Sequence, residues 1–76
     1  SENFSIYELA PLPELIGKTI VDMDIRNKYH TNIVAIQTKD GIQAMPPADY
    51  CFKEEEHLLV IGKNEDIRKL VRKYNN

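Results

Sequence analysis

The chain of 76 residues contains a single cysteine, so no disulfide can form within it. A domain of this size has difficulty burying enough apolar surface, and small domains usually rely on a disulfide, a metal or a partner copy. Cys51, His30 and His57 stand apart and form no CxxC or Cys/His zinc pattern. We therefore expect oligomerisation, in the simplest case a homodimer, to supply the missing stability.

Other absences narrow the class of protein. The sequence has no signal peptide and no apolar run near the roughly 20 residues that span a bilayer. A net charge of −2 argues against a broad basic surface for DNA or RNA. No GxSxG, HExxH, P-loop or GxGxxG motif is present. We expect a cytoplasmic domain that is no enzyme, holds no cofactor or metal, binds no nucleic acid and is not inserted in the membrane.

The first apolar pattern is an alternation near the start of the chain. Phe4, Ile6 and Leu9 fall on one side of a predicted strand, whose buried face they would form. Pro13 suits the first turn of a short helical segment that ends near Gly17. The abrupt, strand-like start also leads us to expect a fragment of a longer protein, cut at a domain boundary.

The rest of the chain predicts one short helix, three strands and a final helix. Residues 18–29 read as a short amphipathic helix broken around Asp24. Two β-prone runs flank Asp40 and Gly41, which predict a two-residue type I′ hairpin, and the proline pair 46–47 ends the second run.

Residues 57–62, HLLVIG, predict a strand covered on both faces, and residues 63–74 an amphipathic helix with Asn64 as its N-cap. The order predicts a small α+β domain with a sheet of about four strands, in which the second sheet face is covered by another copy.

Two charged clusters have ordinary explanations that compete with functional ones. Residues 54–56 are three adjacent glutamates, which fit a solvated turn or a divalent-ion site. Four cations near the C-terminus complement the helix dipole, or contact another protein domain or an acidic lipid surface. Cys51 fits a buried or half-buried inert thiol rather than a nucleophile.

The polar segment, residues 26–32 (RNKYHTN), differs in kind. All seven side chains can form hydrogen bonds, and no Asp or Glu occurs from residue 26 to residue 38. Arg26, Lys28, His30 and Asn32 supply donors that suit phosphate, next to aliphatic side chains just upstream. From the residues alone, a solvated loop and a site for an anionic ligand both remain open.

Several of these stretches together resemble the RCK_C domain, also called TrkA-C. They are FSIYELAP, then LIGKTIVDMDIRNKY with its Gly-Lys-Thr, then an apolar strand, a proline pair, and a strand ending in Gly62 before the last helix. The sequence DIRNKYHTNIVAI is similar to that of the C-lobes of Ktr-type potassium uptake regulators from Gram-positive bacteria. One departure is the stretch from Glu54 to His57, where relatives usually have a Gly-Asp pair.

The resemblance implies a cytoplasmic homodimeric regulatory lobe, peripheral to a membrane potassium transporter subunit, that follows a nucleotide-binding lobe absent from this chain. It implies that cyclic di-AMP binds at the dimer interface and inhibits potassium uptake. The alternative is a structural dimerisation lobe with no nucleotide ligand, with or without a divalent-ion site.

The same resemblance implies roles for single residues. The adenines would pack on Ile20, Ile25 and Pro47, or on the neighbouring Pro46 in place of Pro47. The phosphates would meet Arg26 and Asn32. His30 is a further donor whose role the resemblance does not fix.

Overall fold

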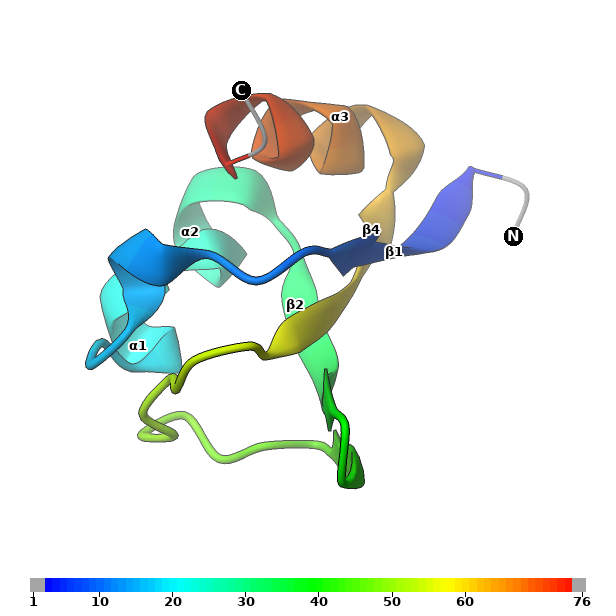
Figure 1. Cartoon of the computed structure of the whole chain (residues 1–76). Coiled ribbons are helices and arrows are strands. Elements are labelled where there is room, and N and C mark those ends of the chain that lie inside the picture. The colour runs from blue at the N-terminus through cyan, green and yellow to red at the C-terminus, as the bar shows by residue number, and fades with distance from the viewer. Residues whose placement is uncertain (1–2, 75–76) are drawn as a thin grey trace.

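The computed structural model describes residues 3–74, which form a four-stranded antiparallel sheet with its helices packed on one face (Figure 1). The elements are β1 (Phe4–Leu9), a 3-10 helix η1 (Pro13–Leu15), α1 (Ile20–Met23), α2 (Ile25–Tyr29), β2 (Asn32–Thr38), β3 (Gly41–Ala44), β4 (His57–Lys63) and α3 (Asn64–Tyr74). The strand order is β1-β4-β2-β3, so β1 and β3 are the edges. The predicted α+β class with four strands is confirmed.

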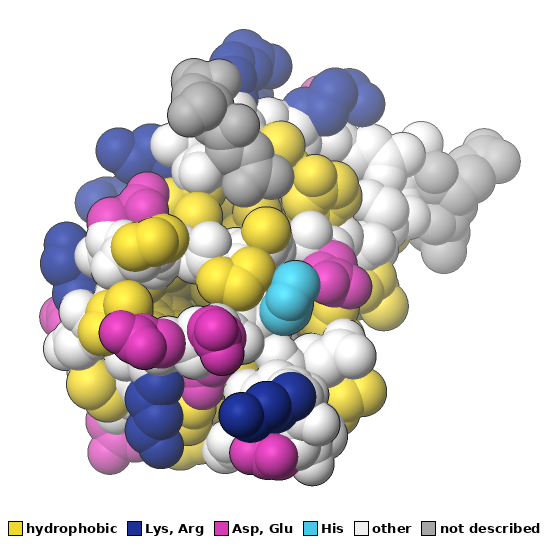
Figure 2. Space-filling view, in the orientation of Figure 1, with side chains coloured by type: hydrophobic (Ala, Val, Ile, Leu, Met, Phe, Trp, Pro, Cys, Tyr) yellow, Lys and Arg dark blue, Asp and Glu magenta, His cyan; other side chains and the backbone are white. Residues whose placement is uncertain are grey.

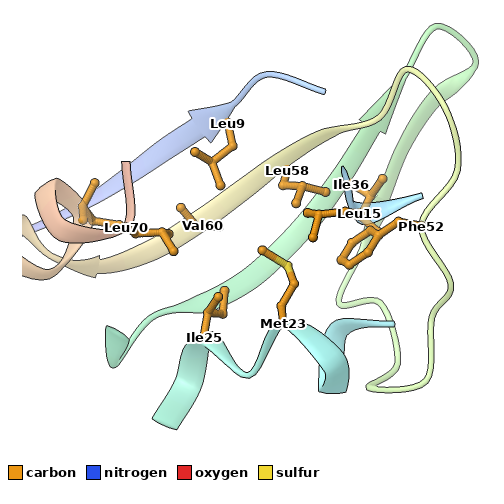
Figure 3. Close-up of a cluster of buried hydrophobic side chains, with 10 residues drawn as sticks. Leu9, Leu15, Met23, Ile25, Ile36, Phe52, Leu58, Val60 and Leu70 are labelled. Atoms are coloured by element: carbon orange, nitrogen blue, oxygen red, sulfur yellow. The ribbon is translucent and has the colours of Figure 1, made fainter. Parts of the chain in front are cut away.

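The core lies between the helices and one face of the sheet (Figure 3). Leu9, Leu58 and Val60 point from β1 and β4 toward side chains of the helices. Met23 and Ile25 reach the same cluster from α1 and α2. Each such side chain stabilises the fold by roughly 1.5–3 kcal/mol relative to leaving it exposed.

The prediction chose the wrong face of β1 as the buried face. Phe4 is 49% and Ile6 63% exposed, whereas Leu9 is fully buried. Leu9 is opposite Leu58 in the register, and both point to the helices, so the odd-numbered positions of β1 face the core side. The alternation was real, but the helices cover the side that carries Ser5 and Tyr7.

The second face of the sheet is only partly covered, which corrects the expectation that β4 is buried on both faces. Burial alternates along β4: Leu58 and Val60 are buried, while Leu59 and Ile61 are half-buried. We call this second face the open face. Its exposed apolar side chains are Phe4, Ile6 and Ile42.

The hairpin differs from the predicted type I′ turn. Thr38 pairs with Gly41, so the two loop residues are Lys39 and Asp40 rather than Asp40 and Gly41. Of these residues only Gly41 has a positive φ, 136°, whereas a type I′ turn needs two in the loop. The hydroxyl of Thr38 also accepts a hydrogen bond of 3.1 Å from the Asp40 amide. β3 ends at Ala44, just before the proline pair, as predicted.

Helix α3 has the predicted buried face, with Ile67 and Leu70 in the core and Val71 and Tyr74 packed against it. It begins at Asn64 itself, one position earlier than an N-cap at Asn64 implies. Within residues 3–74, no helix has the length and apolar character needed to cross a membrane.

Candidate functional site

Two short helices, α1 and α2, position the polar segment, and the Gly-Lys-Thr motif precedes the first of them. Gly17 has a φ of +85°, a conformation that suits glycine. Thr19 then caps α1 through a capping box: its hydroxyl accepts from the Asp22 amide at 3.2 Å, and the Asp22 carboxylate accepts from the Thr19 amide at 2.9 Å. The motif therefore fixes where α1 starts.

The predicted break at Asp24 separates α1 from α2. Asp24 has a left-handed φ of 52°, ends α1 and begins α2. Its carboxylate accepts a hydrogen bond of 2.8 Å from the Asn27 side chain. His30 is also left-handed, with a φ of 53°, and ends α2. The two left-handed residues thus enclose α2, a short helix that contains the first part of the polar segment, between two sharp bends.

Within that turn, the side chains separate into an inner and an outer set. Ile25 is 2% exposed and lies in the core, and Tyr29, four residues later, packs against the core. Arg26, Lys28 and His30 are exposed. The structure therefore places Ile25 inside, where its side chain supports α2, and not on the surface that a direct contact with an adenine requires.

Arg26 and Asn32 present unengaged polar groups. Both are exposed, and within residues 3–74 neither side chain takes part in a hydrogen bond or ion pair. Asn32 starts β2 opposite Ile61, on the open face of the sheet. Its amide and the Arg26 guanidinium are available to an anion from outside the chain.

Backbone hydrogen bonds bring the proline pair close to α1 and β2. The Val21 amide donates to the Ala48 carbonyl at 3.1 Å, one residue beyond Pro47. The Met45 amide donates to the Val34 carbonyl at 2.8 Å, two residues beyond Asn32. Pro47, which is exposed, therefore lies between α1, where Ile20 is half-buried, and the start of β2.

Ile20, Arg26 and His30 belong to α1, α2 and the bend that ends α2, whereas Asn32 lies on the open face of the sheet and Ile25 is buried in the core. The clefts found on residues 3–74 are lined by other residues. We expect a ligand held by the predicted residues to need a second surface to enclose it. The assignment of Ile20, Arg26, His30, Asn32 and Pro47 stays a prediction.

The three glutamates do not converge. Glu54 and Glu55 are exposed, while Glu56 is buried and accepts hydrogen bonds from the Tyr50 hydroxyl and from the Lys53 amide, the latter at 2.7 Å. Burial, together with this bond to Glu56, raises the pKa of Tyr50 to about 12. No group of three or more His, Cys, Asp or Glu in residues 3–74 is placed to hold a metal ion.

Three features of this region were not predicted from the sequence. Glu55 has a left-handed φ of 60°, so the turn exists without the usual glycine. Cys51 is exposed, contrary to the expected burial of its thiol. His57 Nδ1 lies 2.7 Å from the Glu8 carboxylate, a contact between neighbouring strands that sequence spacing cannot reveal.

The architecture is that of a small α+β lobe, with a four-stranded antiparallel sheet, helices on one face and a capped Gly-Lys-Thr turn. A family model for the TrkA-C domain matches residues 4–75, and the chain belongs to this family. The resemblance drawn from the sequence is thereby confirmed.

Two relatives come from Bacillus subtilis (strain 168). The Ktr system potassium uptake protein C is 37% identical over 73 residues, which cover 96% of this chain and 33% of the relative. The Ktr system potassium uptake protein A is 32% identical over 69 residues, which cover 91% of this chain and 31% of the relative. The chain spans about a third of the length of these relatives.

Among solved structures, the chain is similar to the RCK C domain of the potassium transport protein KtrA in complex with cyclic diadenosine monophosphate (c-di-AMP). The TM-score is 0.84 at 28% identity, and the match covers 95% of this chain and 85% of that domain.

Proposed function

We propose that the chain is a cytoplasmic regulatory lobe of a potassium transport system that binds cyclic di-AMP between two copies and thereby inhibits potassium uptake. The observation that carries the proposal is the likeness to the KtrA domain solved with this nucleotide, over nearly the full length of both chains. The likeness to two Ktr system uptake proteins supports the link to potassium transport. The lobe works by binding, without catalysis and without a cofactor.

The surface chemistry around the polar segment supports a phosphate-containing ligand. Arg26 and Asn32 offer donors that are exposed and have no partner within residues 3–74. The carboxylate nearest in sequence, that of Asp24, already accepts from Asn27. Arg26 and Asn32 would bind the phosphates, and His30 adds a further donor.

The aliphatic contacts to the adenines would come from Ile20 and Pro47, with Pro46 as the neighbour that could replace Pro47. Ile25 contributes differently from the original expectation. Because its side chain is buried in the core cluster that also contains Val60 and Leu70, it anchors α2 and so holds Arg26 in position.

A second copy would complete the site. Cyclic di-AMP has two bases and two phosphates related by a two-fold axis, so a homodimer can present each contact twice. Asn32 lies on the open face of the sheet, and the same face carries Ile6, which is 63% exposed. We place the homodimer contact on this face, where burial of apolar surface would drive association.

Binding would regulate transport by favouring one dimer geometry. A ligand shifts a conformational equilibrium only by its difference in affinity for the two states. A nucleotide that contacts both copies binds one dimer geometry more tightly than another, because its contacts change when the two copies move relative to each other. The change would reach the membrane transporter subunit through the full-length regulator.

Calorimetric titration with cyclic di-AMP, beside other cyclic dinucleotides, tests the proposal. Arg26→Ala should weaken binding by about 1.5–3 kcal/mol, because it removes a charged hydrogen bond to phosphate. Lys28→Ala is the matched control: it removes an exposed cation from the same helix and should leave the affinity within about 0.5 kcal/mol.

Two results would contradict this assignment. Equal affinities for the wild type and Arg26→Ala would reject the site, even if the nucleotide binds elsewhere. No heat with any cyclic dinucleotide, from a chain whose mass is that of a dimer, would instead identify a structural dimerisation lobe.

A further inference from the structure

The outer edge of β1 is open to another strand. β1 is at one end of the strand order, and no other strand of residues 3–74 pairs with its outer side. Edge strands are commonly protected by lysine, proline, a bulge or shortness. β1 is six residues long and contains neither lysine nor proline, and the irregularity of the sheet is in β2, between Ile33 and Ala35. The one charged residue of β1, Glu8, lies on the open face and contacts His57.

A groove runs beside this edge, between β1 and α3. The residues that line it include Ser5, Tyr7, Ile67, Val71, Arg68 and Arg72. Ile67 and Val71 are buried or half-buried and form the apolar floor, while Arg68 and Arg72 are exposed. Among residues 3–74, no carboxylate lines the groove.

The two arginines are spaced to meet a strand. Residues four apart on a helix lie on one face, about 6 Å apart along its axis. Alternate residues of a strand point to the same side and are separated by about 6.7 Å. A strand beside β1 with acidic residues at alternate positions would therefore match Arg68 and Arg72 with successive carboxylates.

The charge of α3 has the sign that such a strand requires. From residue 67 to residue 74 the helix has four cations and no acid, although the whole chain has a net charge of −2. Figure 2 shows Lys and Arg side chains gathered over α3 at the top of the molecule.

We propose that the edge of β1 and this groove bind an extended acidic segment of another protein, which adds a strand to the sheet. Its backbone pairs with β1, its glutamates lie over Ile67 and Val71 and reach Arg68 and Arg72, and its alternate aliphatic side chains extend the apolar row that includes Ile6. Main-chain hydrogen bonds supply affinity and the arginine pair supplies selectivity.

A second copy of the chain fits this edge poorly. Pairing two β1 strands around a two-fold axis would place the two α3 helices side by side, with Arg68 and Arg72 of both copies facing each other. Like charges at such a seam are destabilising. A lipid surface provides anions but no strand to pair with β1.

The test is the fluorescence anisotropy of a labelled peptide of about ten residues in which glutamate and valine alternate, a length that matches a typical strand. We expect the wild-type chain to bind it, and the double substitution Arg68→Glu with Arg72→Glu to weaken binding about tenfold or more. The matched control is Lys69→Glu with Lys73→Glu, the same change of charge on the same helix but outside the groove, which should change the affinity by about twofold or less.

Two modified peptides test the strand itself. A peptide with methyl groups on alternate backbone amides should lose binding, because it cannot pair with an edge. A peptide of the same composition with its glutamates in one block should bind more weakly than the alternating one. Circular dichroism establishes that each variant is folded.

Several outcomes would overturn the proposal. They are failure of the alternating peptide to bind, equal losses from the arginine and lysine pairs, and full binding of the methylated peptide. A dimer that dissociates on the arginine substitutions would identify a second copy as the occupant. Binding to vesicles rich in phosphatidylglycerol that needs the arginine pair, without peptide binding, would identify a lipid surface.

Discussion

Gly62 in β4 must be a glycine because of the side chain of Thr31, which packs against it. A Cβ atom at this position would lie 2.7 Å from the Cγ2 of Thr31, closer than such atoms approach in proteins. Thr31 is fully buried and immediately follows the left-handed His30. The bend that ends α2 therefore packs directly against the backbone of the central strand β4.

We expect Gly62→Ala to lower the free energy of unfolding by about 1–3 kcal/mol, because the new methyl group overpacks the space that Thr31 fills. Thr31→Ser removes the clashing Cγ2 and keeps the hydroxyl. Urea denaturation of both single variants and the double variant measures the coupling. The double variant should be more stable than the sum of the single effects implies, and strict additivity would contradict the steric explanation.

At the scale of an element, the connection between β3 and β4 is ordered by its own polar contacts. Tyr50 and Glu56 form a hydrogen bond across it, and the Glu56 carboxylate also accepts from the Lys53 amide. The Gly17 amide donates to the Phe52 carbonyl at 3.0 Å, and the Phe52 amide donates to the Lys18 carbonyl at 2.8 Å. The connection thereby holds the Gly-Lys-Thr turn and the start of α1.

The burial of Tyr50 and its hydrogen bond to Glu56 predict that the stability of the fold depends on pH. The pKa of Tyr50 is about 12 in the folded chain and 10.0 in its ordinary state. Between these pH values the unfolded chain loses the phenolic proton of Tyr50 while the folded chain retains it. The contribution of Tyr50 to the stability of the fold is therefore complete below pH 10 and is lost as the pH rises toward 12. Tyr50→Phe should be less stable at neutral pH and should lose less stability over this alkaline range.

Urea denaturation of the wild type and Tyr50→Phe at a series of pH values checks this prediction. Tyr74 serves as a comparison, since burial followed by the nearby Tyr29 and Glu14 also raises its pKa, and Tyr50→Phe leaves that contribution unchanged. Parallel curves of stability against pH for the two proteins would show that Tyr50 does not carry the effect.

At the scale of the whole molecule, the sheet has one covered and one open face. The open face carries Ile6 and Ile42, which are 63% and 62% exposed, with half-buried Leu59 and Ile61 between them. Exposed apolar side chains on one face of a very small domain favour association. The homodimer expected from the small core stays a prediction.

We expect Ile6→Lys to dissociate the proposed homodimer, because it places a charge within the proposed contact on the open face. Val21→Lys is the matched control, since Val21 is 61% exposed, much as Ile6 is, but lies on α1 and not on the open face. Sedimentation equilibrium gives the mass of each variant and circular dichroism its fold. If the Ile6→Lys variant is still a dimer, the homodimer contact does not lie on the open face.

The sequence by itself determined the elements and the family of this protein, because periodicity, prolines and caps are local. The break at Asp24, the apolar face of α3 and the end of β3 at the proline pair were all predictable. These features depend on backbone conformation and on side-chain spacing within a few residues.

Only the tertiary structure decided which side of each element is buried. Alternation in β1 marked Phe4 and Ile6 as one face, but α3 packs on the other face and leaves them exposed. Left-handed Asp24 resets the helical phase, so spacing from Ile20 could not show that Ile25 points into the core. Burial depends on contacts between residues far apart in the chain, whereas conformation within each element depends mainly on neighbouring residues.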